Sequence, residues 1–221
     1  MIVNEHIEGY IDSLIPDLPD DLRDLEEWAL ANGVPIIRKS MQQFLKVILL
    51  ERNPLKILEI GTAIGFSTLF LERFSRPETE ITTIEKVEMR LKEARKNLAG
   101  HDRIRLIEGD ALTVLDNMIL NHTERYDFIF LDAAKGQYPE FLKPIKTLLN
   151  PGGMLVTDNV LLDGSIAESK FSIERRDRTI HKRMREYLYE LTHSDDFETV
   201  ILPVGDGVAV SINKEKYFEK A

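Results

Sequence analysis

Oxygen-bearing side chains follow two apolar segments that the sequence places side by side as strands of a parallel sheet. Asp132 ends the segment 126–132, Asp158 ends the segment 153–158, and Asn159 follows directly. Because the carboxyl ends of parallel strands meet at one edge of a sheet, we expect these three side chains to converge. Carboxylate and amide oxygens suit Mg²⁺ or Mn²⁺ and leave positions open for water and substrate. The alternative is that each residue only caps the helix that follows its strand.

Lys135 lies three residues beyond Asp132 and therefore near the same edge of the sheet. Its amine could take a proton from a substrate hydroxyl or stabilise the resulting oxyanion, so Lys135 and Asp132 are the catalytic candidates. A solvated lysine is the alternative. The absence of His and Cys from this set argues against zinc. The histidines lack ligand spacing and are expected at the surface: His6, His101, His122, His181 and His193.

A second group of residues ends three earlier strands and predicts a site for an adenosine. Gly61 and Gly65 have the spacing Gly-x-x-x-Gly, which lets the backbone approach a ligand but differs from the dinucleotide motif Gly-x-Gly-x-x-Gly. Glu85 ends the next strand, where a carboxylate can accept both ribose hydroxyls. Asp110 and Ala111 follow the third strand, and Asp110 could accept a hydrogen bond from an adenine amino group. Adenosine binding without a phosphate favours S-adenosylmethionine over NAD. The alternative is that the glycines only form a tight turn and that Glu85 and Asp110 only cap helices.

The elements that must position these residues alternate between strands and helices. Strands are predicted at 55–60, 80–85, 103–108, 126–132 and 153–158, and helices between them at 66–75, 87–99, 111–121 and 138–149. Further helices are predicted at 5–15, 19–32, 37–51 and 171–193, a turn at 150–153, and final strands at 199–202 and 208–212. Strands that alternate with helical crossovers indicate an α/β fold, with a parallel sheet covered by helices on both faces.

Composition fits one α/β domain. Of 221 residues, 43% are hydrophobic and 30% charged, which is ordinary for a globular protein. We expect a single domain over 1–221, with a helical extension at 1–50 and a cofactor-binding core at 55–213. No apolar run approaches the length of a membrane span, and the first residues lack a signal-peptide pattern, so a cytoplasmic protein without a membrane partner is expected. The absence of cysteine excludes a disulfide framework and a thiolate nucleophile.

The net charge of −9 is unevenly distributed. Residues 1–27 hold nine acids and one base, whereas residues 170–186 hold seven bases and three acids. A local basic face that binds phosphates therefore remains open, and the alternative is a solvated helix whose acids pair with its bases. The bases of this stretch are Lys170, Arg175, Arg176, Arg178, Lys182, Arg183 and Arg185.

These motifs resemble the metal-dependent O-methyltransferases related to catechol and caffeoyl-CoA O-methyltransferases. The resemblance covers about residues 30–213. It rests on five segments: Leu58-Glu59-Ile60-Gly61-Thr62, Glu85, Gly109-Asp110-Ala111, Leu131-Asp132-Ala133-Ala134-Lys135 and Thr157-Asp158-Asn159. Within that family, Val34-Pro35-Ile36, the segment Leu131 to Tyr138, and Pro203-Val204-Gly205-Asp206-Gly207 are most similar to bacterial tRNA 5-hydroxyuridine methyltransferases, which form 5-methoxyuridine at the anticodon wobble position.

The resemblance implies a Rossmann-like class I methyltransferase fold, with a mostly parallel seven-stranded sheet and a C-terminal antiparallel hairpin. It also implies the same metal ligands, a homodimer, and a set of contacts to S-adenosylmethionine. These contacts are Ile37, Glu59, Gly61, Ser67, Glu85, Ala111 and Asp132. Ile37 stands where relatives often carry methionine, and both side chains are apolar.

Three functions are compatible with this pattern. A bound Mg²⁺ would favour the oxyanion of a phenol-like hydroxyl, which would then attack the methyl sulfonium. 5-Hydroxyuridine in a tRNA anticodon loop is the first substrate hypothesis, with Arg175, Arg176, Arg178 and Lys182 as the face toward tRNA. A small catechol or an acyl-CoA-linked phenol, with two adjacent oxygens, is the second. A non-catalytic cofactor-binding scaffold is the third, and the presence of all three metal ligands argues against it.

Overall fold

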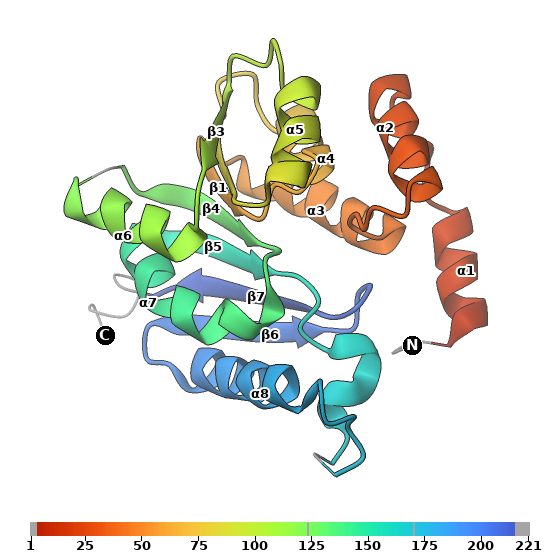
Figure 1. Ribbon diagram of the computed structural model, residues 1–221, viewed down its shortest axis with the longest axis vertical. Coiled ribbons are helices and arrows are strands. Elements are labelled where there is room, and N and C mark those ends of the chain that lie inside the picture. Colours follow the sequence, from red (N-terminus) through yellow and green to blue (C-terminus); the bar gives the residue numbers. More distant parts are fainter. Residues whose placement is uncertain (1–3, 123, 170, 215–221) are drawn as a thin grey trace.

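A single seven-stranded sheet forms the centre of the molecule (Figure 1). The computed structural model describes residues 4–122, 124–169 and 171–214. The strand order is β3-β2-β1-β4-β5-β7-β6, in which β3 to β5 run parallel and β7 is antiparallel to both β5 and β6. The strands are β1 (Lys56–Ile60), β2 (Glu80–Glu85), β3 (Ile104–Glu108), β4 (Tyr126–Leu131), β5 (Leu149–Thr157), β6 (Phe197–Leu202) and β7 (Val208–Asn213). The predicted α/β class and the C-terminal antiparallel hairpin are confirmed.

Both faces of the sheet are buried under helices, so successive strand residues enter different cores. In β4, Phe128 and Phe130 pack against α3 and α4, whereas Ile129 and Leu131 pack against α6, α7 and α8. The helices of the first face are α2 (Asp20–Ala31), α3 (Lys39–Arg52) and α4 (Phe66–Phe74). Those of the second face are α6 (Ala111–Leu120), α7 (Tyr138–Leu148) and α8 (Arg178–His193).

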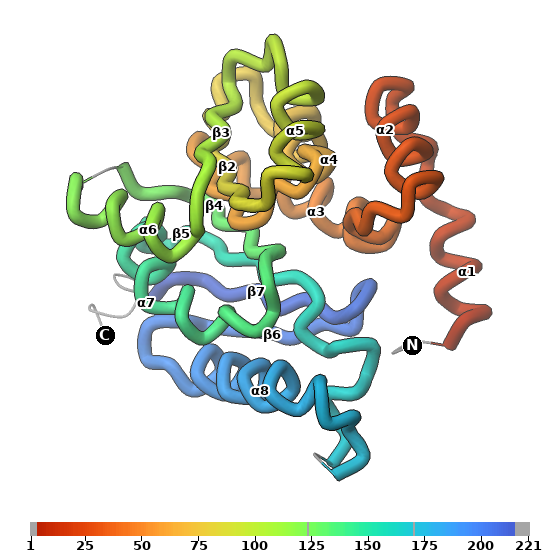
Figure 2. Tube along the Cα trace, viewed as in Figure 1, coloured from red at the N-terminus to blue at the C-terminus, as the bar shows by residue number. Residues whose placement is uncertain are grey.

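The remaining helices include the first helix of the chain, which lies at the edge of the molecule, away from the sheet (Figures 1 and 2). They are α1 (Glu5–Ser13), α5 (Glu88–Asn97) and the short 3₁₀ helices η1 (Lys135–Gln137) and η2 (Leu162–Ala167). None of the helices in the described residues has the length and apolar character needed to cross a bilayer.

Two predicted boundaries are wrong. The helix predicted at 171–193 begins only at Arg178, because residues 171–177 form turns instead. The turn predicted at 150–153 lies inside β5, which starts at Leu149 and passes through an irregularity before Met154 regains register with Phe128. A local Pro-Gly-Gly signal is compatible with such a bulge as well as with a turn.

Gly61 allows the end of β1 to approach the end of β4. The Asp132 backbone N–H donates to the Ile60 carbonyl oxygen at 3.0 Å. A Cβ at Gly61, whose φ is +113°, would lie 2.0 Å from the Asp132 carbonyl oxygen. The glycine is therefore required by the neighbouring strand, whereas the sequence had suggested that the ligand alone required it.

The Gly61 contact predicts a specific loss of stability. Gly61→Ala should lower the free energy of unfolding by at least about 3 kcal/mol, because it combines an unfavourable φ with a collision against backbone. Gly100→Ala is the matched control, since Gly100 also has a positive φ of +84° but nothing within 4 Å of the added Cβ. It should cost only about 1 kcal/mol. Equal losses in urea unfolding would contradict the collision.

Candidate active site

A cavity opens beyond the carboxyl ends of β1, β2 and β4, where the strand order reverses direction between β1 and β4. Such a reversal leaves a crevice between helices that cover opposite faces of the sheet. Six of the predicted cofactor residues line this cavity: Ile37, Gly61, Ser67, Glu85, Ala111 and Asp132. Arg90, which the sequence did not single out, also lines it. The structure thus brings together residues that are up to 95 positions apart in the sequence (Ile37 to Asp132).

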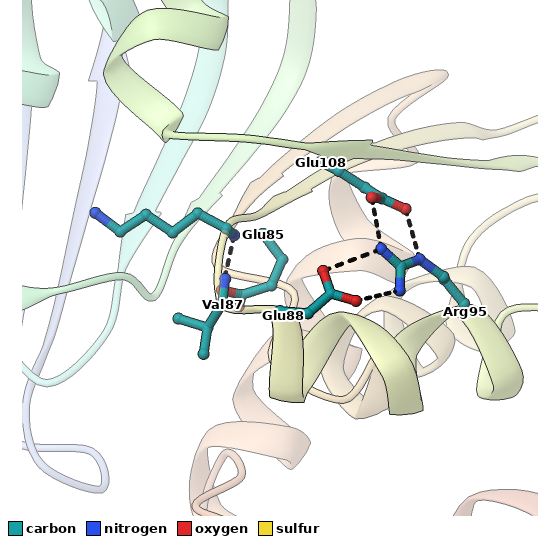
Figure 3. A network of polar contacts seen from close by, with 6 residues as sticks. Glu85, Val87, Glu88, Arg95 and Glu108 are labelled. Carbon is teal, nitrogen blue, oxygen red and sulfur yellow. Dashed lines mark hydrogen bonds and ion pairs between the residues drawn. The ribbon is translucent and has the colours of Figure 1, made fainter.

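Glu85 is held at this cavity by backbone N–H groups. Its Oε1 accepts from the N–H groups of Lys86 and Val87 at 2.9 Å (Figure 3). Its Oε2 accepts from the Ala63 N–H, also at 2.9 Å. The side chain is buried and points to the glycine loop after β1. Because each carboxylate oxygen has two lone pairs, Oε2 keeps capacity for a further donor such as a ribose hydroxyl.

A charged network next to Glu85 ties α5 to β3. Arg95 donates to both Glu88 and Glu108, at 2.6–3.3 Å (Figure 3). These bidentate bonds raise the pKa of Arg95 and lower the pKa of both carboxyls. The network lies on the surface, so its contribution is to hold the start of α5 near the turn that follows Glu85.

Glu59 and Asp110 do not line the cavity. Glu59 is fully buried beneath it, where it accepts from Ser67, Thr68 and Thr83. Burial raises its pKa to about 7, and its Oε1 has no hydrogen-bond partner among the described residues. Asp110 caps α6 through the Thr113 N–H and pairs with Lys86 at 3.0 Å, which lowers its pKa. Contact of these two acids with the cofactor stays a prediction. Asp110 has the helix-capping geometry that was the alternative interpretation of this residue.

Asp132 and Asp158, two of the predicted metal ligands, lie beside each other at the sheet edge, and Asn159 follows Asp158 directly. The Asp158 N–H donates to the Leu131 carbonyl oxygen at 3.0 Å, which sets Asp158 beside Asp132. Burial raises the pKa of both carboxyls, and the charge of Asp132 raises that of Asp158 further. Asn159 adopts a left-handed φ of +58°, a conformation that asparagine tolerates better than most residues. Two mutually repelling carboxylates, Asp158 buried and Asp132 half-buried, fit a divalent cation, which would offset their repulsion.

The predicted metal ligands comprise two carboxylates, Asp132 and Asp158, and one amide, Asn159. No group of three or more His, Cys, Asp or Glu side chains in the described ranges is arranged to hold a metal ion. The predicted site contains two carboxylates, so it depends on Asn159 as the third protein ligand. Metal binding therefore stays a prediction that the local chemistry favours.

Lys135 is fixed by an acid that the sequence analysis gave no role. Its Nζ lies 3.2 Å from Oδ2 of Asp206, which is 3% exposed. The other oxygen of Asp206 accepts from the Asp163 N–H, and Asp163 in turn pairs with Arg38 at 2.9 Å. These contacts join four segments of the chain at the edge of the site, those before α3, after β4, after β5 and between β6 and β7. The only sequence signal was the segment 203–207, which carried the resemblance but suggested no partner for Asp206.

The basic stretch is exposed but largely paired within the chain. Arg176 contacts Glu174 and Asp177, at 3.0 and 3.5 Å, and Lys182 lies 3.5 Å from Glu186. The guanidinium groups of Arg178, Arg183 and Arg185 donate to the backbone carbonyls of Ile173, Gly136 and Ile166. Lys170 lies outside the described residues. Contact with tRNA phosphates stays a prediction for Arg175, Arg176, Arg178 and Lys182.

His181 is buried, so its expected place at the surface is wrong. It is 3% exposed and shares one face of α8 with Met184, Tyr187 and Leu191. The signal that was missed is this spacing of three to four residues on a helix. Its Nε2 has no hydrogen-bond partner among the described residues.

Comparisons with known proteins agree with this geometry. A family model described as O-methyltransferase matches residues 17–214. A caffeoyl-CoA O-methyltransferase from Citrus natsudaidai is 31% identical over 209 residues, which are 90% of this chain and 89% of the relative. A catechol O-methyltransferase from Niastella koreensis is 29% identical over 74% of this chain and 76% of its own.

Solved structures give the same picture. A Staphylococcus aureus protein, provisionally assigned as a caffeoyl-CoA O-methyltransferase, has a TM-score of 0.86 and 32% identity over 95% of this chain and all of its own. A Podospora anserina methyltransferase, solved with SAH, has a TM-score of 0.84 and 25% identity over 96% of this chain and 97% of its own. The Rossmann-like methyltransferase fold that the motifs implied is confirmed.

The carboxylate pair predicts opposite effects of one substitution. In metal-free buffer at neutral pH, Asp158→Asn should raise the melting temperature. Folding raises the pKa of Asp158 above its unfolded value, so at this pH the carboxyl must take up a proton or carry a disfavoured charge, and asparagine avoids both costs. Saturating Mg²⁺ should raise the melting temperature of the unmodified chain by about 5–10 °C and that of Asp158→Asn far less. Glu88→Gln, on the surface network, should respond to Mg²⁺ as the unmodified chain does. An equal Mg²⁺ response in all three proteins would exclude this site.

Proposed function

Because the chain belongs to the O-methyltransferase family, we propose that it transfers a methyl group from S-adenosylmethionine to a hydroxyl that has a second oxygen beside it. The observation that carries this proposal is the meeting of Asp132, Asp158 and Lys135 beside a cavity for a nucleoside. A donor of methyl groups and an acceptor oxygen can then share one edge of the sheet.

The cavity is suited to S-adenosylmethionine. Glu85 offers Oε2 toward the glycine loop, where ribose hydroxyls could donate to it. Ile37 and Ala111 add apolar walls on either side. A relative with 25% identity was solved with SAH, the product form of this donor. When bound, S-adenosylmethionine supplies an electrophilic methyl group on a sulfonium.

The acceptor would be held by the oxygen ligands at the end of β4 and β5. Asp132, Asp158 and Asn159 would hold a divalent cation, which when bound favours loss of the proton from a coordinated hydroxyl. Asp206 orients Lys135 at 3.2 Å, so the ammonium lies where it can stabilise a developing oxyanion. The fixed strand ends orient donor and acceptor toward each other, which contributes much of the rate of a two-substrate reaction.

A small phenol is the first candidate substrate. Two of the relatives are named for caffeoyl-CoA and catechol, and both names denote an aromatic ring with adjacent oxygens. Such a pair of oxygens could bind one cation as a five-membered chelate. We therefore expect a catechol or a CoA-linked phenol to be methylated at one of its two hydroxyls.

5-Hydroxyuridine in a tRNA anticodon loop is the second candidate. Its hydroxyl lies next to the 4-carbonyl oxygen, which offers the same chelate. The observation in its favour is the pair Arg175 and Arg176, exposed on the turns that precede α8 in a chain of net charge −9. A single-stranded loop can present a splayed base to a shallow site, whereas a duplex cannot.

Glu85 provides a test of the donor site. Glu85→Ala should weaken S-adenosylmethionine binding by roughly 1–3 kcal/mol, the scale of hydrogen bonds to a charged group. Calorimetry measures the affinity, and Glu85→Gln, which keeps one carbonyl oxygen, should lose less. Glu88→Ala is the control from the adjacent surface network. Because Glu85 also holds the glycine loop, melting curves must show that each variant is folded. Unchanged affinity in folded Glu85→Ala would leave Glu85 a purely structural role.

Substrate choice is tested with labelled S-adenosylmethionine and two acceptors, a catechol panel that includes caffeoyl-CoA and bulk tRNA from a strain lacking the enzyme. We expect transfer to the small phenol, loss of transfer with excess chelator, and recovery with Mg²⁺ or Mn²⁺. Full activity of Asp158→Ala in chelator would contradict the proposed metal role.

The tRNA alternative predicts a different pattern. Nucleoside analysis would show 5-methoxyuridine, and Arg175→Ala combined with Arg176→Ala would raise the KM for tRNA while leaving cofactor affinity unchanged. Each lost phosphate contact would also reduce the salt dependence by a log–log slope of roughly 0.7. Lys92→Ala with Lys96→Ala, on the distant α5, is the control for general charge.

A further inference from the structure

The donor cavity contains a basic side chain to which the proposed function gives no role. Arg90 lies on the first turn of α5 and lines the cavity together with Glu85 and Asp132. Its side chain is 49% exposed, and no hydrogen bond joins its guanidinium to another of the described residues. Arg90 is therefore available to a ligand that enters the cavity.

The turn from β2 into α5 places Arg90 beside Glu85. The Val87 N–H donates to Oε1 of Glu85, and the Val87 carbonyl oxygen accepts from the Arg90 N–H at 2.8 Å. The bonds of Arg95 tie the same turn of α5 to β3 (Figure 3). The backbone thus fixes an acid and a base next to each other at the cavity.

Arg90 approaches the oxygen of Glu85 that has the larger spare capacity. Oε1 already accepts from two backbone N–H groups, whereas Oε2 accepts from one, that of Ala63. Nη1 of Arg90 lies 3.9 Å from Oε2, which is too far for a hydrogen bond. A hydroxyl that binds Oε2 would therefore lie within reach of the same guanidinium. Lys86, another base in the lining, is already paired with Asp110 at 3.0 Å.

We propose that Arg90 is a second contact for the ribose of the donor, which it would bind together with Glu85. A ribose hydroxyl would donate to Oε2 of Glu85 and accept from the guanidinium of Arg90, a group with five N–H donors and no acceptor. Both hydrogen bonds are charge-assisted, and a hydroxyl that donates becomes a better acceptor, so each bond strengthens the other. The inference rests on the proposed S-adenosylmethionine site and adds a residue that recognises the ribose diol.

The other parts of the donor fit this position less well. A guanidinium beside the sulfonium would be repelled by its positive charge. The carboxylate of the donor is separated from the ribose by the sulfur and several carbons, so a guanidinium beside Oε2 of Glu85 meets the ribose first. Stacking on the adenine is within the chemistry of arginine. It would not require the guanidinium to lie next to Oε2, however, so the observed position of Arg90 favours the ribose.

Calorimetry with SAH tests the contact, because SAH keeps the ribose and lacks the positive charge on sulfur. Arg90→Met keeps an unbranched side chain and removes every donor, so it should weaken SAH binding by about 5- to 20-fold, the lower range for a charge-assisted bond at a half-exposed group. Arg90→Lys keeps a charged donor and should lose less. Lys96→Met, on the same helix and 75% exposed, is the control for the loss of a positive charge. Unchanged SAH affinity in Arg90→Met would overturn the proposal.

A change of ligand identifies the group that Arg90 contacts. Adenosine and 2′,3′-dideoxyadenosine are compared as competitors of labelled S-adenosylmethionine. The unmodified chain should prefer adenosine, and Arg90→Met should reduce this preference by about fivefold, because the lost hydrogen bond needs the ribose hydroxyl. Equal weakening of both ligands would assign Arg90 to the adenine and refute the ribose contact. A chain that binds SAH independently of Arg90 refutes this contact alone, whereas a chain that binds neither S-adenosylmethionine nor SAH refutes the proposed donor as well.

Discussion

The close approach of β1 and β4 is the constraint on which the site depends. Only glycine fits at position 61, since a Cβ would meet the Asp132 carbonyl oxygen at 2.0 Å. This approach pairs the two strands to their last residues, and the Asp132 N–H reaches the Ile60 carbonyl. The glycine loop of the cofactor cavity and the first carboxylate of the proposed metal site therefore begin at the same point. Because this region is closely packed, the glycine loop and Asp132 cannot shift independently.

The charges of Asp132 and Asp158 determine which group can bind at the ends of β4 and β5. Asp132 and Asp158 are placed together in a region where burial already disfavours their charges. Proteins retain such an arrangement when a bound group compensates for its cost, because unpaired buried charge is strongly destabilising. Lys135 supplies part of the compensation, but it also pairs with Asp206. The remaining demand for positive charge is the physical reason to expect a divalent cation.

Periodicity predicted the strands well because burial on both faces leaves uninterrupted apolar segments, and strand ends then identify the converging polar residues. Local patterns could not predict contacts made between loops. Asp206 binds Lys135 across 71 positions, and no spacing in the sequence reports that distance. The turns at 171–177 were mistaken for helix because their many charged residues also suit an exposed helix. Histidine is usually a surface residue, but His181 lies on the apolar face of α8 and is therefore buried.

Chemistry and specificity are therefore held by different parts of the chain. The candidate residues for methyl transfer stand at the ends of buried strands, whose positions the core fixes. The proposed acceptor side is bounded by loops that a few polar contacts join: Arg38 with Asp163, and Asp206 with Lys135 and the Asp163 N–H. Loops tolerate substitution and insertion far better than strands do. The same strand ends can thus serve different acceptor hydroxyls in different proteins, according to the loops that lie over them.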